Sequence, residues 1–565
     1  MKQILYLLLG CLIPFQFLTA KMYSSPERTP VDYVNPYIGN ISHLLVPTYP
    51  TVHLPNSMLR VYPERENFTG NTINGLPLIV TSHRGSSAFN LSPYQGELQK
   101  AGSIIQYGYD NEVIKPYYYS VDLDDDGMYV QYAPSHQSGI YQIDFSQTDK
   151  PAYLIFNTRN GELKTDGKSI SGYQKLGNHT QVYIYLETDQ QPLKIGTHQG
   201  AVIRTTDKST QGHNAYYILE YPKGTASVLL RYGVSFISSE QAKQNLRREI
   251  KNYNLQAVAD KGRSVWNETL GKIFVKGGTE NEKTVFYTSL YRTYERMICI
   301  YEDGRYFSAY DGQVHDDEGI PFYVDDWIWD TYRATHPLRL IIETEMESNM
   351  VNSLIRMAYQ MQPNWMPTFP EINGDSRRMN CNHGVATVLD AYNKGMRSFD
   401  LAKAYQVCKA AITEKTLAPW SSKPAGVLDQ FYKDHGYFPA LAVGEQETVP
   451  EVHSWERRQP AAVTLGTVYD EWCLGNIAQA LGDKKEADYF LKRSLNYHKI
   501  FNKETCFFHP KDSFGNFIQP FDYRYSSGVG GRDAYDENNG WVYRWDLPHN
   551  VADLVNMMGG KERFV

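Results

Sequence analysis

The chain is poor in cysteine and holds no closely spaced pair of cysteines. Its 565 residues include six cysteines, and no Cys-x-x-Cys pair occurs among them. This excludes a zinc ribbon and a small fold held together by disulfides. Five cysteines follow the N-terminal apolar segment, and we predict that they are buried small hydrophobic side chains: Cys299, Cys381, Cys408, Cys473 and Cys506.

An excess of positive charge is also missing. The 56 Lys and Arg residues are outnumbered by 63 Asp and Glu residues, which gives a formal net charge of −7. Because no basic stripe is present, nucleic acid is not an expected partner. The sequence contains no His-Glu-x-x-His, no Gly-x-Ser-x-Gly and no Gly-x-x-x-x-Gly-Lys. Zinc protease, serine hydrolase and P-loop chemistry are therefore not indicated.

Long apolar runs are confined to the N-terminus. Lys2 precedes a mostly apolar stretch from Ile4 to Leu18, and Leu18-Thr19-Ala20 fits a cleavage site. This pattern predicts a signal peptide at 1–20 and an exported protein. The alternative is a lipoprotein signal in Leu8-Leu9-Gly10-Cys11, with a lipid anchor on Cys11. No later segment has the roughly 18 apolar residues that a membrane span needs.

The sequence changes character near residue 240. Before this point, short runs rich in Val, Ile, Tyr and Thr alternate with Gly, Asn and Asp turns, which predicts an all-β sandwich over 30–240. The predicted strands are Ser103–Tyr107, Tyr117–Leu123, Tyr129–Tyr132, Tyr153–Asn157, Gln181–Glu187 and Ser227–Tyr232. The polar segment from Gln241 to Leu270 has helical spacing, and we predict a helical linker over 241–272.

After Lys272 the helical period dominates. The predicted helices are Glu282–Ile300, Glu343–Met361, Gly384–Met396, Leu401–Thr413, Gly466–Leu481 and Lys484–Ile500. Long loops at Asp303–Pro321 and Gln362–Met379 separate some of them, and such loops in a compact domain are usually functional or disordered. Repeated helix pairs with long loops at one end predict an α/α toroid over 273–565, whose loops would line a cleft.

The segment Tyr323–Arg333 carries the most distinctive chemistry. Three Asp and two Trp lie within six positions of it. Trp faces can stack on a sugar ring while Asp oxygens accept hydrogen bonds from its hydroxyls, which is typical of a concave binding pocket. A second interpretation is equally compatible with these residues, namely a buried Trp cluster beside a solvated acidic loop.

A second acidic and aromatic group lies between Asp533 and Asp546. If a helix continues past Gly540, Glu537, Trp541 and Trp545 share one face at four-residue steps. A carboxyl group packed against indoles loses hydration, so its pKa rises, as a general acid for a glycosidic oxygen requires. The alternative is a helix start with acidic residues near its N-terminus and tryptophans in the core.

Together these residues resemble glycoside hydrolase family 92, which comprises bacterial exo-acting α-mannosidases. The resemblance runs from Val34 almost to the last residue, and it rests on the order and spacing of several motifs. The motifs are Val34-Asn35-Pro36-Tyr37-Ile38-Gly39, Trp266-Asn267-Glu268, Phe286-Tyr287-Thr288-Ser289-Leu290-Tyr291, Trp329-Asp330-Thr331-Tyr332-Arg333 with His336-Pro337-Leu338, Asn380-Cys381, Asp390-Ala391-Tyr392, Tyr469-Asp470-Glu471-Trp472-Cys473 and Trp541-Val542-Tyr543-Arg544-Trp545.

The resemblance implies a β-sandwich joined by a linker to an (α/α)6 barrel, in a protein exported to the periplasm or cell surface of a bacterium. It also implies calcium-dependent, inverting hydrolysis of terminal α-mannosyl residues of glycans. In an inverting mechanism an acid protonates the leaving oxygen while a base activates water on the opposite face, and the two carboxyls lie roughly 6.5–9.5 Å apart. Calcium prefers oxygen ligands, but its ligands are not assigned.

The resemblance also assigns individual residues. Glu537 matches the family's general acid, although this chain has Glu537-Asn538-Asn539 where members mostly have Glu-Gly-Asn or Glu-Ser-Asn. Trp329 and Asp330 match residues expected to line the sugar subsite. Further candidates for substrate binding are Trp541, Asp326, Arg333, which could instead orient a carboxylate, and His383, which could be structural or could donate a hydrogen bond.

Two departures from the family leave alternatives open. The segment after Gly39 differs, which leaves the substrate preference undecided. The family's general-base aspartates lie in a region beyond Val565, so we expect a truncated barrel. A non-catalytic glycan-binding protein or an inactive fragment is therefore the alternative function. Another α/α-toroid enzyme, such as a polysaccharide lyase, is a third interpretation.

Overall fold

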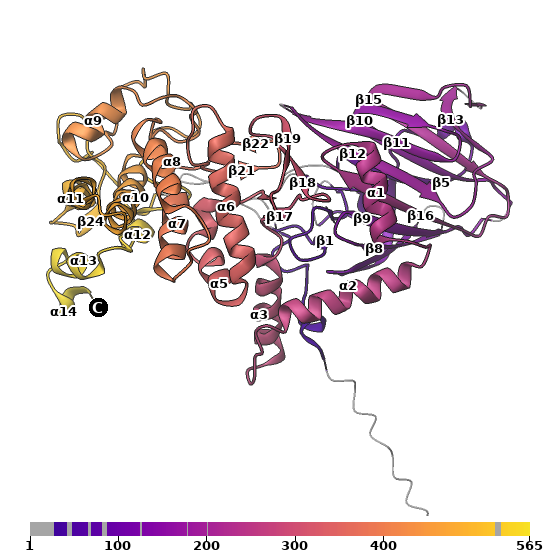
Figure 1. Cartoon of the computed structure of the whole chain (residues 1–565), viewed down its shortest axis with the longest axis horizontal. Helices are drawn as coiled ribbons and strands as arrows, with labels where there is room; N and C mark the ends of the chain where they lie inside the picture. The colour runs from indigo at the N-terminus through magenta and orange to yellow at the C-terminus, as the bar shows by residue number, and fades with distance from the viewer. Residues whose placement is uncertain are drawn as a thin grey trace, which may run out of the picture.

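The computed structural model describes residues 28–41, 48–65, 69–81, 87–124, 127–147, 149–177, 179–199, 202–525 and 533–564. A β domain and a helical domain lie next to each other along the long axis of the molecule (Figure 1). The predicted signal peptide and Cys11 lie outside the described residues. In the described segments, none of the helices combines the length and hydropathy that a membrane crossing requires.

The N-terminal domain is a β-sandwich of antiparallel strands. Its elements are η1 (Pro30–Tyr33), β1 (Val52–His53), β2 (Arg60–Val61), β3 (Thr72–Asn74), β4 (Leu76–Pro77), β5 (Phe89–Gln95), η2 (Leu98–Lys100), β6 (Gln106–Lys115), β7 (Tyr118–Leu123), β8 (Met128–Pro134), β9 (Ser138–Asp144), β10 (Ala152–Thr165), β11 (Ser169–Gly177), β12 (Thr180–Thr188), β13 (Lys194–Gln199), β14 (Val202–Arg204), β15 (Ser209–Tyr221) and β16 (Ser227–Ser235).

Strand β10 is the centre of the sheet topology. The strand order is β14-β13-β15-β10-β11-β12-β16-β9-β8-β7-β6-β3, and β4 pairs with β5, which also joins β10. The first half of β10, Ala152–Thr158, pairs with β5, whereas its second half pairs with β11. β15 accompanies β10 along both halves. The sheet therefore divides at β10.

Alternating side chains explain why these segments form strands. In β12, Val182, Ile184 and Leu186 are fully buried while the residues between them are partly exposed. Successive side chains in a strand point to opposite faces, so this alternation buries one face. Five of the six predicted strands coincide with observed ones. The exception is Ser103–Tyr107, because β6 begins only at Gln106.

The predicted helical linker is not one continuous helix. It contains α1 (Ser239–Glu249) and α2 (Leu255–Leu270), and Ile250 separates the two with an extended backbone. Asn254 begins the second helix, because its side chain accepts a hydrogen bond from the Ala257 amide, which satisfies one of the unpaired amides at a helix start. In Figure 1, α1 lies against the sandwich and α2 runs beneath it toward the helical domain.

The C-terminal domain is helical, with short hairpins in its loops. Its elements are α3 (Glu280–Thr293), β17 (Ile298–Cys299), β18 (Arg305–Ser308), β19 (Gln313–Asp316), β20 (Tyr323–Val324), α4 (Ile328–Thr331), α5 (Thr335–Ile342), α6 (Thr344–Gln360), β21 (Pro370–Glu371), β22 (Gly374–Asp375), α7 (Gly384–Asn393), α8 (Leu401–Thr413), α9 (Val427–His435), α10 (Pro460–Ala480), α11 (Lys484–Arg493), η3 (Asn496–Lys499), β23 (Phe501–Asn502), β24 (Phe507–Phe508), α12 (Gly540–Tyr543), α13 (Val551–Met557) and α14 (Lys561–Phe564).

Three predicted helix boundaries need correction. α3 ends at Thr293 and not at Ile300, because Ile298 and Cys299 pair with β20. α10 begins earlier than predicted, at Pro460, a residue that tolerates the first helical turn. α11 ends at Arg493, and η3 follows it. The closure of these helices into an (α/α)6 barrel stays a prediction.

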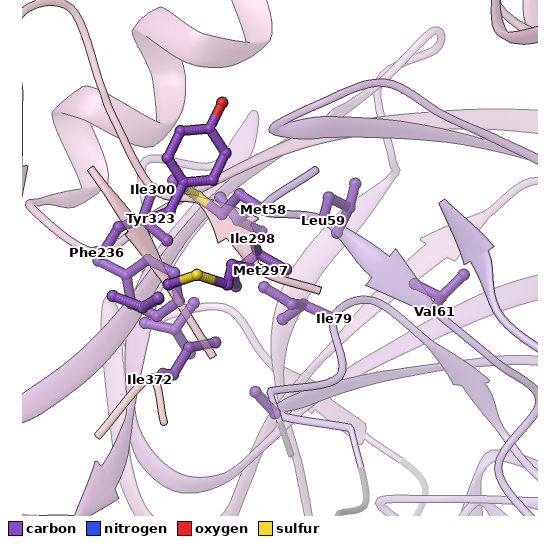
Figure 2. Close-up of a cluster of buried hydrophobic side chains, with 14 of the residues drawn as sticks. Met58, Leu59, Val61, Ile79, Phe236, Met297, Ile298, Ile300, Tyr323 and Ile372 are labelled. Atoms are coloured by element: carbon purple, nitrogen blue, oxygen red, sulfur yellow. The ribbon is translucent and has the colours of Figure 1, made fainter. Parts of the chain in front are cut away.

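The two domains share one hydrophobic core. Figure 2 shows a cluster of this core that joins side chains of the β domain to side chains of the helical domain: Met58, Leu59, Val61, Ile79, Phe236, Met297, Ile298, Ile300, Tyr323 and Ile372. The short β17–β20 pair lies inside this interface and leads directly into the Asp- and Trp-rich loop. Packing between the domains therefore fixes the start of that loop.

Candidate functional site

The Asp- and Trp-rich loop starts at an ion cluster between the domains. Asp325 adopts a left-handed backbone conformation, with φ of 69°. Its carboxylate accepts from Arg60 of β2 at 2.5 Å and from Arg296 at 2.7 Å. The Arg296 guanidinium also lies 4.1 Å from the ring centroid of Trp327, in a cation–π contact. Asp325 is buried and anchors the loop.

Asp326 is fully buried behind the short helix α4. Its Oδ1 accepts a hydrogen bond from the Thr331 hydroxyl at 2.9 Å, and its Oδ2 lies 2.8 Å from Nε2 of His336. Burial favours a raised pKa, but the positive charges of His336 and Arg339 outweigh it and lower the pKa of Asp326. Asp326 is a predicted substrate ligand, yet its surroundings leave no access for a sugar and support a role in holding α4.

Asp330 lies in α4 and is accessible to water. Its side chain is exposed, yet the dense surrounding protein raises its pKa to about 6, with further contributions from the negative charges of Glu537 and Asp326. The negative charge of Glu537 is among the causes of this raised pKa, so the two predicted residues, more than two hundred positions apart in sequence, fall within electrostatic range of each other.

Asn380 connects the Trp329 loop to the Glu537 segment. Its Oδ1 accepts from Nε1 of Trp329 at 3.3 Å, while its Nδ2 donates to Asp536 at 2.9 Å and to Gln459 at 2.8 Å. Because Asn380 is buried, these bonds are shielded from water. The indole of Trp329, which is half-buried, is thereby oriented next to the segment that carries Glu537.

Glu537 is half-buried and has a left-handed backbone conformation, with φ of 51°. The predicted helical face that joins it to Trp541 and Trp545 is not formed, because α12 begins only at Gly540 and spans four residues. Trp541 is 51% exposed and packs its ring edge on Phe507, while Trp545 is 46% exposed and packs on Phe564. Glu537 is therefore within electrostatic range of Asp330. Trp541 packs on Phe507 instead.

Arg333 and His383 each contact an aspartate. The Arg333 guanidinium, which is more than half exposed, donates to Asp546 at 2.8 Å. His383 is buried, with Nδ1 2.7 Å from Asp470 and its ring 4.3 Å from the ring of Tyr332. Both candidates therefore lie around the same α4 region, because Tyr332 and Arg333 follow that helix directly.

Several residues of this region were not predicted as site residues. Asn380, Asp470, Tyr332 and Asp546 connect the predicted side chains, although they occur in or beside the motifs quoted above. The site loops also contain a group of left-handed residues other than glycine: Asp325, Arg377, Met379, Cys381, Gln459 and Glu537. Such backbone is sparsely populated and often occurs at functional sites, but no sequence signal indicates it at these residue types.

A metal site is not evident among these side chains. In the parts of the chain with described coordinates, no group of three His, Cys, Asp or Glu residues gathers in a way that could hold a metal ion. A cavity of about 720 Å³ lies nearby, lined in part by His453, Arg457, Asp533 and Tyr535. None of the seven predicted site residues lines it, so the geometry of the α4 region and not this cavity defines the candidate site.

A β-sandwich fused to a helical domain, with two carboxyls and a tryptophan at the candidate site, is an arrangement that a carbohydrate-active enzyme of two domains can use. Comparison with known families agrees. The model of the glycosyl hydrolase family 92 N-terminal domain matches residues 33–235, and that of the family's catalytic domain matches 241–565. The chain belongs to glycosyl hydrolase family 92 and is a glycosidase.

Two solved structures and one curated protein are similar to this chain over most of its length. The family GH92 inverting mannosidase of Bacteroides thetaiotaomicron VPI-5482 is 25% identical, with a TM-score of 0.83 over 96% of this chain and 74% of that chain. A GH92 α-mannosidase of Bacteroides thetaiotaomicron in complex with mannoimidazole is 22% identical, with a TM-score of 0.81 over 95% and 73%. A protein of Arthroderma benhamiae described as an uncharacterized secreted glycosidase is 22% identical over 98% of this chain and 75% of its own length.

Proposed function

We propose that this glycosidase removes terminal α-mannosyl residues from glycans with inversion at the anomeric carbon, and that Glu537 is its general acid. The observation that carries the proposal is the Asn380 bridge, which joins Trp329 to Asp536, the neighbour of Glu537. The charge of Glu537 also contributes to the raised pKa of the accessible Asp330. Family membership and the 25% identity to an inverting mannosidase support the same activity.

In this proposal Trp329 and Asp330 hold the terminal sugar. The Trp329 indole, oriented by Asn380, offers an apolar face for the ring, and the ionised Asp330 accepts hydrogen bonds from sugar hydroxyls. Arg333 and Trp541 are exposed and remain proposed contacts for more distant parts of the glycan. His383 is proposed to contribute to substrate binding through Tyr332, against which its ring packs.

Glu537 then transfers a proton to the glycosidic oxygen as the bond to the anomeric carbon breaks. Glu537 is half-buried, and a general acid has to lie within hydrogen-bond reach of the oxygen that it protonates. Inversion also needs a carboxylate that activates water on the opposite face of the ring. We assign that role to no residue of the described segments.

Calcium is implied by the family resemblance and not by the side chains described above. A calcium site usually has six to eight oxygen ligands, several of them carboxylates, and no cluster of three or more candidate ligand residues occurs in the described ranges. We therefore assign no calcium ligands and no step of the reaction to the metal. Hydrolysis measured with a chelator and after calcium is restored tests whether the reaction needs it.

Export is also part of the proposal. The N-terminal pattern supports it, as does the similarity to a secreted glycosidase of Arthroderma benhamiae. The N-terminal pattern has two interpretations, a cleaved signal peptide and a lipoprotein signal with a lipid on Cys11. We propose location in the periplasm or on the cell surface accordingly. Fractionation of cells with labelling by palmitate separates them.

Hydrolysis of α-mannobiose, followed by proton NMR, tests the function. We expect β-mannose as the first product, which identifies inversion. The Glu537→Gln variant should lower kcat/KM by about 10²–10⁴-fold, but should affect α-mannosyl fluoride much less because fluoride leaves without protonation. Glu414→Gln, at an exposed position in the same domain, is the matched control. Unchanged turnover of mannobiose by Glu537→Gln would remove Glu537 from the mechanism.

A further inference from the structure

Three ionisable side chains form a buried, hydrogen-bonded row directly behind α4. His336 of α5 lies between Asp326, 2.8 Å from its Nε2, and Glu347 of α6, 2.7 Å from its Nδ1. The side chains of all three are at most 1% exposed. Such a group is costly to bury unless every charge is paired, and the catalytic steps above do not use it.

The geometry fixes the protonation of His336. A neutral imidazole donates from one nitrogen and accepts at the other, so one of its two nitrogens would face a carboxylate lone pair. An imidazolium donates from both nitrogens, one to each carboxylate. Burial alone would lower the pKa of His336, but the charges of Glu347 and Asp326 raise it to about 10. The group therefore stays charged at neutral pH.

The row continues into the helix that carries the proposed sugar contacts. The Asp326 oxygen that does not face His336 lies 2.9 Å from the hydroxyl of Thr331, the last residue of α4, and the Trp327 carbonyl is a second acceptor for that hydroxyl at 3.0 Å. α4 has only four residues, and the amides of Asp330 and Thr331 both donate to the carbonyl of Trp327. So short a helix has little stability of its own, and its position depends on contacts outside it.

We propose that His336 is a positioning residue, which acts through Asp326 and Thr331 to hold α4 so that Trp329 and Asp330 face the sugar. The contact of Trp329 and Asp330 with the sugar rests on the proposed function. Glu347 is at one end of the row, and the long helix α6, to which it belongs, holds it in position. Arg339, buried nearby, adds a positive charge that further favours ionised Asp326.

Two variants test this proposal by hydrogen–deuterium exchange and by kinetics. Thr331→Val removes the hydroxyl and keeps the shape of the side chain, so the buried row itself stays intact. His336→Gln removes the charge between the carboxylates. We expect amides in the peptide 326–333 to exchange about tenfold faster in both variants, because a hydrogen bond to a charged group is lost. We also expect kcat/KM for α-mannobiose to fall by about tenfold or more.

The matched control is His315→Gln. His315 also pairs with an aspartate, Asp311, at 2.8 Å, but in the β18–β19 hairpin and partly exposed. Its removal should leave exchange in 326–333 and hydrolysis unchanged. Wild-type exchange of 326–333 in Thr331→Val overturns the proposal, even if His336→Gln does not fold. Absence of hydrolysis by the wild type contradicts the proposed function instead, and the exchange data still decide whether the row positions α4.

Discussion

Arg60, from the β-sandwich, and Asp325, from the loop before α4, form an ion pair at 2.5 Å with side chains only 2% and 4% exposed. The pair crosses the boundary between the two domains and lies next to the start of the proposed sugar-binding segment. The Arg60 guanidinium also donates to the carbonyl oxygens of Val80 and Glu295. The sandwich thus contributes directly to the position of the site, although it supplies none of the predicted site residues.

Replacing Arg60 by Met should destabilise the protein markedly. Removal of one partner of a buried ion pair costs about 3–5 kcal/mol because a charge is left uncompensated. Arg296 still contacts Asp325 at 2.7 Å, so we expect a value at the lower end. Urea unfolding of Arg60→Met and Arg60→Lys measures this, with the charge-preserving variant closer to wild type.

The control for this prediction is Arg28→Met. Arg28 also pairs across a long sequence distance, with Glu280, but both side chains are more than half exposed. Exposed pairs contribute at most about 1 kcal/mol. Equal stability of Arg60→Met and Arg28→Met would show that the buried pair does not hold the domains together.

The electrostatic interaction between Glu537 and Asp330 predicts how the binding of a mannoside depends on pH. Asp330 must be ionised to accept hydrogen bonds from sugar hydroxyls, and its pKa is raised to about 6 by burial, then by Glu537 and by Asp326, against Arg333 and Arg296. Binding of methyl α-mannoside to the wild type should therefore weaken as the pH falls through 6.

In Glu537→Gln a negative charge is removed, so the pKa of Asp330 falls and the loss of binding moves to lower pH. Calorimetric titration between pH 4 and 8 measures the change. Asp330→Asn is the control, and we expect weaker binding without this pH dependence. Identical profiles for wild type and Glu537→Gln would contradict the proximity of the two carboxyls.

The success of the sequence-based predictions follows from how local each signal is. The strand at Gln181–Glu187 and the helix at Leu401–Thr413 were predicted because period and capping lie within the segment, with Asp400 accepting from the Lys403 amide. The end of α3 was not predicted correctly. The chain leaves the helix after Thr293 because Ile298 and Cys299 pair with β20, a tertiary contact that no local pattern encodes.

The candidate site shows the same limit. Motifs predict Trp329, Asp330 and Glu537 as site residues, which stays a prediction, but their mutual placement depends on Asn380, which bridges segments far apart in sequence. Asp326 looked like a ligand because it is acidic and adjacent to Trp327. Its burial depends on His336, which lies in a helix that the periodicity did not predict.

His336 predicts how stability changes in mild alkali. Its pKa is about 10 in the folded protein, against an ordinary value of 6.5, so the folded chain retains a proton that the unfolded chain releases. The stabilisation is complete below pH 6.5 and is lost as the pH rises through 10, by up to about 1.4 kcal/mol per pH unit. Unfolding of wild type and His336→Gln at pH 6, 7.5 and 9 measures it. The difference between the two proteins should shrink with rising pH, and a constant difference would indicate that His336 is neutral.

Gly466 of α10 predicts a coupled pair of substitutions. A Cβ at this position would lie 2.3 Å from Sγ of Cys381, closer than any real contact, so Gly466→Ala must displace the Cys381 side chain, which neighbours Asn380 in the same loop. Although alanine favours a helix by up to about 1 kcal/mol over glycine, overpacking costs about 1–3 kcal/mol, and we expect net destabilisation and weaker sugar binding. Cys381→Ala in the same chain removes the clashing sulfur and should restore both stability and binding. Thermal unfolding and calorimetry of the single and double variants form a complete cycle. If the double variant is no better than Gly466→Ala alone, the contact between this helix and the Asn380 loop does not determine the geometry of the site.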